Sequence, residues 1–126
     1  MRAILEGVAY SLKDTFTIFD EMQVPVERIR VGGGGARSKL WRQIQADVYA
    51  HEVEFLEAEE GAAYGAAILA GVGAGTWKGV DDACDAAVRT AGRVPPRAES
   101  CAVMQKNYVT YRRLYPALHS AFEPPA

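Results

Sequence analysis

The chain has 126 residues, of which 49% are hydrophobic and 24% charged, proportions typical of one soluble domain with its own core. Its net charge of -2 at pH 7 excludes a bulk attraction to nucleic acid or anionic membrane, and no apolar run reaches the ~18 residues that span a bilayer. The two cysteines, Cys84 and Cys101, lie far apart without a CxxC pattern, which predicts reduced thiols in a cytoplasmic protein and no metal site.

A long helix is predicted over residues 2–23, and Pro25 ends it. Its apolar residues recur at steps of three and four, so we expect them to form one buried face. These residues are Ile4, Val8, Leu12, Phe16, Phe19 and Met22. No capping residue precedes the pattern, which is already running at Arg2, as expected for a chain that begins inside an element.

The next segment reads as strand, turn, helix and strand. Residues 27–31 carry β-branched side chains and predict a short strand that runs into four glycines, and residues 52–56 predict a second strand. Ser38 is the expected N-cap of the helix between them. The expected buried face of that helix consists of Leu40, Trp41, Ile44 and Val48. This order resembles a βαβ unit and favours parallel pairing of the two strands.

Helices dominate the remainder of the chain. Glu59 and Glu60 are expected to open a helix rich in alanine and glycine, and a short helix follows over 80–90. Residues 94–96 are expected to be extended, and a last helix covers 101–122. An aromatic-rich stripe along this last helix is expected to pack on the domain. The stripe consists of Met104, Tyr108, Tyr111, Tyr115, Leu118 and Phe122.

The run of four glycines is the candidate binding feature. A glycine-rich turn before a helix exposes backbone N–H groups and lacks the Cβ atoms that would hold a ligand away. Gly33, Gly34 and Gly35 supply that access, and Ser38 and Lys39 could add a hydroxyl and an ammonium. The spacing matches neither GxGxxG nor GxxxxGK[ST]. On spacing alone, a structural turn with positive φ is an equally good interpretation.

Four segments, taken in order, resemble the C-terminal end of the FGGY carbohydrate kinases. They are RAILEGVAYSL at 2–12, GGGARSKLWRQIQADV at 33–48, EGAAYGAAILAGVGAGTW at 60–77 and YRRLYPAL at 111–118. The second is similar to the adenosine motif of the family, and the third to the helix that flanks its nucleotide pocket. Together they extend over nearly the whole chain.

The resemblance implies an α/β fold that is part of an actin-like, ribonuclease H-like domain, helix-rich with a small, mostly parallel sheet. Residues 1–126 would be a fragment, the C-terminal nucleotide-binding domain, with 101–123 as its closing helix. The implied reaction transfers the γ-phosphate of ATP to a sugar or polyol hydroxyl with Mg²⁺. The implied nucleotide-binding residues are Gly33, Gly34, Gly35, Ala36, Ser38 and Lys39.

Within the family, the EGVAY and GGGARS forms favour D-xylulose over glycerol as the acceptor, with gluconate, ribulose and fuculose as alternatives. The catalytic and metal-binding carboxylates are expected upstream, so the fragment alone should be inactive. Its unpaired strand edges predict self-association, for example as a homodimer. Two rival hypotheses remain: a stand-alone nucleotide-binding or regulatory module, and a helical interaction domain that uses the stripe on 104–122.

Overall fold

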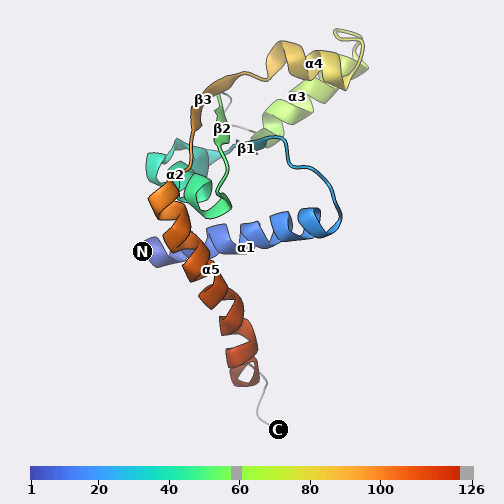
Figure 1. Ribbon diagram of the computed structural model, residues 1–126. Helices are drawn as coiled ribbons and strands as arrows, with labels where there is room; N and C mark the ends of the chain where they lie inside the picture. The colour runs from blue at the N-terminus through green and yellow to red at the C-terminus, as the bar shows by residue number, and fades with distance from the viewer. Residues whose placement is uncertain (58–60, 123–126) are drawn as a thin grey trace.

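The computed structural model describes residues 1–57 and 61–122 as five α-helices, three strands and two short 3₁₀ helices (Figure 1). In chain order these are α1 (Arg2–Glu21), β1 (Ile29–Val31), a 3₁₀ helix (Gly34–Arg37), α2 (Lys39–Tyr49), β2 (Val53–Leu56), α3 (Gly61–Gly73), α4 (Val80–Ala87), β3 (Thr90–Val94), α5 (Ala98–Leu118) and a 3₁₀ helix (His119–Ala121). The predicted helix-rich α/β architecture is confirmed.

The sheet has the order β1-β2-β3. β1 and β2 are parallel, with Ile29 opposite Val53, as the strand–helix–strand pattern predicted. β3 runs antiparallel to β2, with Phe55 opposite Gly92, so the sheet is mixed and the expectation of a mostly parallel sheet is corrected. The sequence placed Thr90 at the end of a helix, but that helix ends at Ala87. TAGRV has little β propensity of its own, and pairing with β2 makes it a strand.

The main core joins α1, α2 and α5. Its buried side chains are Ala9, Tyr10, Ile44, Val48, Met104 and Tyr108. The Tyr10 hydroxyl donates to Met104 Sδ at 3.3 Å, and the Lys13 ammonium donates to the Val48 carbonyl at 2.7 Å. That carbonyl belongs to the last turn of α2, where a cation is favourable. Contacts between distant segments therefore fix how these three helices cross.

α2 is the central helix, because it is buried on two sides. Ile44 and Val48 face the helices, and Ala46 packs with Val31 and Val53 of the sheet. Ser38 accepts a hydrogen bond from the Trp41 N–H at 3.2 Å, which confirms the predicted N-cap. The predicted face is correct for Ile44 and Val48 and wrong for Leu40, which is 51% exposed.

The prediction of which face of α1 is buried is wrong. Four of the six residues predicted to be buried are exposed: Ile4, Val8, Leu12 and Met22. Ala9 and Tyr10, on another face, are buried instead. α1 carries apolar residues on both faces, and periodicity cannot choose between them. The small side chain of Ala9 fits the close approach of the neighbouring helices, and the Tyr10 ring packs 5.9 Å from the Tyr108 ring.

α5 is covered over only part of its length. Met104 and Tyr108 are buried, as predicted for the aromatic stripe. The prediction fails toward the end of α5, where Tyr115 is 67% exposed and the helix extends away from the others (Figure 1). Phe122, which follows the second 3₁₀ helix, is 70% exposed. The closing helix starts at Ala98, three residues before its predicted start, and residue 123 lies outside the described part.

α3 and α4 pack on each other at the far side of the sheet (Figure 1). The Tyr64 hydroxyl donates to the Ala87 carbonyl at 2.6 Å, which ties the end of α4 to α3. Asp81 and Asp82 lie in the first turn of α4, as predicted, whereas Glu59 and Glu60 lie outside the described residues. None of the helices in the described ranges is both long and apolar enough to cross a membrane.

Candidate functional site

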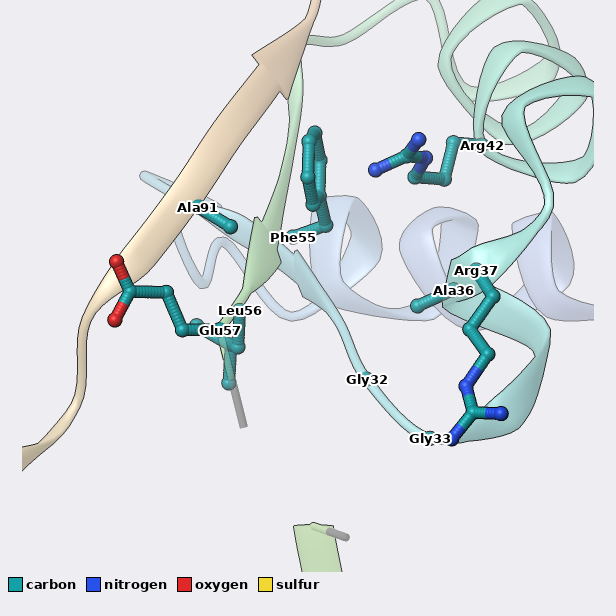
Figure 2. Close-up of a pocket in the computed structure, with 9 residues that line it drawn as sticks. All are labelled: Gly32, Gly33, Ala36, Arg37, Arg42, Phe55, Leu56, Glu57 and Ala91. Atoms are coloured by element: carbon teal, nitrogen blue, oxygen red, sulfur yellow. The ribbon is translucent and has the colours of Figure 1, made fainter. Parts of the chain in front are cut away.

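A cavity of about 210 Å³ lies where the parallel strands β1 and β2 end (Figure 2). Its walls come from the turn after β1, from α2, from the end of β2 and from β3. The lining residues are Gly32, Gly33, Ala36, Arg37, Arg42, Phe55, Leu56, Glu57 and Ala91. In open α/β sheets, ligands bind in the crevice outside the carboxyl ends of the strands. This cavity is therefore the candidate functional site.

The glycine turn forms one rim of the cavity. Gly33 has φ of 73°, a left-handed conformation that suits glycine, and it starts the 3₁₀ helix Gly34–Arg37. A Cβ atom built at Gly32, Gly33 or Gly34 would meet nothing within 4 Å, so the backbone there borders open space. A ligand can therefore approach this main chain closely. The turn combines both interpretations of the sequence, a positive-φ bend and an open backbone surface.

Only two of the six predicted nucleotide-binding residues line the cavity. Gly33 and Ala36 line the cavity, and Gly34 lies beside them in the 3₁₀ helix. A Cβ atom at Gly35 would lie 3.3 Å from the Trp41 indole, so this glycine accommodates Trp41. The remaining two, Ser38 and Lys39, are exposed at the start of α2 and are not among the lining residues. Their roles in binding stay predictions.

Sequence reasoning missed the opposite wall. Phe55, Leu56 and Glu57 end β2 and continue beyond it, and Ala91 comes from β3. The end of the second predicted strand was a usable signal, because parallel strands present their carboxyl ends at one edge. Ala91 had no such signal, since β3 itself was not predicted.

Arg42 stacks on Phe55 in the cavity wall. The guanidinium carbon of Arg42 lies 3.6 Å from the centroid of the Phe55 ring. Glu57 extends away from both Arg37 and Arg42 (Figure 2). Two cationic side chains thus line one side of the cavity, which favours an anionic or electron-rich ligand.

The described residues, 1–57 and 61–122, contain no cluster of three potential metal-ligating side chains from His, Cys, Asp or Glu. Cys84 and Cys101 are both free, half-buried thiols. The polar groups at the cavity are main-chain groups of the glycine turn, Arg37, Arg42 and Glu57, beside the apolar side chains.

A wider groove of about 540 Å³ lies along the exposed end of α5. It is lined by Asp14, Tyr111, Arg112, Leu114, Tyr115, Pro116, Leu118 and Phe122. Its walls are mostly apolar side chains on a helix, without the open glycine backbone found beside Gly33. For a phosphorylated ligand, the cavity at the strand ends is the better match.

Comparison with known proteins supports the implied family. The model of the C-terminal domain of the FGGY family of carbohydrate kinases matches residues 1–74, from α1 through α3. A xylulose kinase of Staphylococcus epidermidis is 34% identical over 114 residues, which are 90% of this chain and 23% of that protein. A gluconokinase of Bacillus licheniformis is 36% identical over 123 residues, 97% of this chain and 24% of that protein.

A solved structure agrees with the sequence comparisons. The crystal structure of a xylulose kinase from Rhodospirillum rubrum matches with a TM-score of 0.79 and 35% identity, over 96% of this chain and 25% of that one. The expected actin-like fold is thereby confirmed. The chain spans about a quarter of the length of the proteins that it matches.

Proposed function

This chain belongs to the FGGY family of carbohydrate kinases, and we propose that it forms the nucleotide-binding wall of an ATP-dependent sugar kinase. The observation that carries the proposal is the cavity at the carboxyl ends of β1 and β2, with its open glycine rim. At about 210 Å³ it is smaller than the roughly 300–1,000 Å³ of a complete ligand pocket. It would hold part of a nucleotide, and other residues of the enzyme would contact the remaining part.

The glycine rim would hold the nucleotide through the main chain. Gly33, Gly34, Gly35 and Ala36 would lie along the adenosine and the inner phosphate, with the open backbone at Gly33 and Gly34 as the closest approach. The Ala36 N–H already donates to the Gly33 carbonyl at 3.0 Å, so the glycine N–H groups would be the donors. Ser38 and Lys39 complete the proposed set at the start of α2. The Ser38 hydroxyl already accepts the Trp41 N–H, so its proposed part is to hold the turn in place.

The proposed acceptor of the γ-phosphate is a hydroxyl of D-xylulose, giving D-xylulose 5-phosphate. The similarity to xylulose kinases in both sequence and structure supports this choice. Gluconate is the alternative, supported by a gluconokinase with 36% identity over 97% of the chain. A comparison of phosphorylation rates of the two sugars by the whole enzyme would decide between them.

We propose that the magnesium ligands and the catalytic base lie outside this chain, as the family resemblance implies. Phosphoryl transfer depends on positioning and on charge stabilisation around the γ-phosphate. We therefore expect no formation of D-xylulose 5-phosphate when the 126-residue chain is incubated with ATP, Mg²⁺ and D-xylulose in a coupled assay. Turnover above the no-protein background would contradict the idea that this chain is one wall of the site.

Filling the cavity tests the site itself. Ala91 is exposed, and its side chain points toward Phe55 inside the cavity (Figure 2). Ala91→Trp is expected to weaken ADP binding about tenfold or more, because the indole would occupy the space that the ligand needs. Ligand-observed NMR with ADP at millimolar concentration would measure the change.

Ala102→Trp is the matched control. Ala102 is also exposed but lies on α5, away from this cavity, so ADP binding should match that of the unchanged chain. Equal ADP binding by the Ala91 and Ala102 variants would place the nucleotide elsewhere.

A further inference from the structure

Arg42 has one buried donor that the described residues do not use. Its Nε atom is buried, and within residues 1–57 and 61–122 it has no hydrogen-bond partner. A buried, unpaired N–H is uncommon in native structures and costs free energy. The guanidinium nevertheless lies in a defined place, over the Phe55 ring and in the wall of the cavity. Among the described residues, the contact that positions this guanidinium is therefore its stacking on Phe55, while Nε stays without an acceptor.

Phe55 is itself held from the opposite side. It pairs across the sheet with Gly92, and a Cβ atom built at Gly92 would lie only 2.6 Å from Cζ of the ring. The ring therefore fills the space that the missing side chain of Gly92 leaves. In Figure 2 it stands between β3 and Arg42. Gly92, Phe55 and Arg42 form a stack that places a flat cationic group at the cavity.

The surroundings of this stack suit an oxyanion. Arg37 lines the same cavity, and the carboxylate of Glu57 points away from both arginines (Figure 2). Gly32 and Gly33 leave the facing backbone open. A planar guanidinium presents parallel N–H donors that match two oxygens of one phosphate group, which a lysine ammonium cannot do.

We propose that Arg42 recognises a phosphate group of the bound nucleotide, with its guanidinium donating to phosphate oxygens while the stack on Phe55 fixes its plane. The inference rests on the proposed function and assigns one residue of that site. It is a binding role, with no covalent step. Stacking engages the face of the guanidinium and leaves its in-plane N–H groups, Nε–H among them, as donors for the ligand. A pre-oriented donor loses less conformational entropy on binding.

The test compares ligands with and without phosphate in the unchanged chain, Arg42→Met and Arg42→Lys. The probes are ADP, adenosine and inorganic pyrophosphate, followed by ligand-observed NMR and by the Nε–Hε resonance of Arg42. Arg42→Met keeps much of the side-chain length and can still cover Phe55, and Arg42→Lys keeps the charge. We expect Arg42→Met to weaken ADP binding about tenfold or more, and adenosine binding less than about twofold. Arg42→Lys should recover only part of the loss, because it lacks the planar fork.

The outcomes separate this inference from the proposed function. Equal losses for ADP and adenosine in Arg42→Met would overturn the phosphate role, as would no loss for either. If pyrophosphate shifts the Arg42 resonance while ADP and adenosine do not bind, the anion site stands and the nucleotide proposal fails. If ADP binds and leaves that resonance unmoved, the nucleotide proposal stands and the role of Arg42 fails. Thermal unfolding of each variant shows whether its fold is intact. If a variant unfolds, the shift of the Arg42 Nε–Hε resonance in the unchanged chain still tests whether Arg42 contacts the phosphate.

Discussion

Replacement of Asp47 by alanine is expected to lower the free energy of unfolding by about 3 kcal/mol, because it breaks a buried charged network. The Asp47 side chain is completely buried, and it accepts hydrogen bonds from three groups of Arg97. The Arg97 backbone N–H donates to Oδ1 at 2.9 Å, and its Nε and a terminal nitrogen donate to Oδ2 at 3.1 Å and 2.5 Å. Denaturant unfolding of the 126-residue chain would measure the loss.

The network matters because it joins distant parts of the chain. Asp47 lies on α2, and Arg97 is the N-cap residue of α5. Gln43 adds a second connection, since its amide donates to both Asp47 Oδ1 at 2.9 Å and the Pro95 carbonyl at 3.1 Å. Loss of the carboxylate would therefore loosen the start of α5 as well as one ion pair.

Two variants make this prediction specific. Asp47→Asn keeps the side-chain volume but turns an N–H donor toward Arg97, so it should lose most of the same stability. Glu52→Ala removes an exposed pairing with Arg93, measured at 3.5 Å, and should change stability by less than about 0.5 kcal/mol. Full stability of Asp47→Asn would show that the charge of Asp47 does not contribute.

The pH dependence gives an independent check. Burial by itself raises the pKa of the Asp47 carboxyl, but hydrogen bonds from Arg97 and Gln43 and the charge of Arg97 outweigh it and hold the pKa below its ordinary value of 3.8. A depressed pKa in the folded state stabilises the fold above the unfolded pKa, and this contribution is lost as the pH falls through the folded value. The stability difference between the unchanged chain and Asp47→Ala should be complete at neutral pH and shrink below about pH 4.

Replacement of Gly92 by valine is expected to destabilise the fold by roughly 2 kcal/mol, although valine has the higher strand propensity. The new Cβ would lie 2.6 Å from Cζ and 2.9 Å from Cε1 of Phe55. The ring cannot move away freely, because the guanidinium of Arg42 lies 3.6 Å from its centroid on the other side. Moving it would also deform the cavity, so ADP binding should weaken together with thermal stability.

A double-mutant cycle identifies the cause. With Phe55→Ala as the background, Gly92→Val should cost little or even stabilise the strand, because the collision is gone and only the propensity difference remains. A loss of similar size in both backgrounds would show that the Phe55 ring is not responsible.

Local chemistry explains what could be predicted of the fold and site. The strand β1, the glycine turn, the Ser38 cap and the helix α2 were all found, because each depends on interactions within a few residues. Parallel pairing of β1 and β2 followed from their connection through a helix. The four motifs in order also identified the family, and the position of the glycine turn indicated one rim of the cavity.

The remaining features depend on contacts between residues far apart in the chain, so they follow from the folded arrangement and not from local patterns. Pairing with β2 makes TAGRV a strand, and packing against α2 and α5 selects the Ala9–Tyr10 face of α1 over the equally periodic face with Ile4 and Val8. The stack of Gly92, Phe55 and Arg42 joins three elements, and no spacing along the chain encodes it. By itself the sequence determined the family and one rim of the candidate site, whereas the opposite wall and its stacked cation exist only once the sheet has formed.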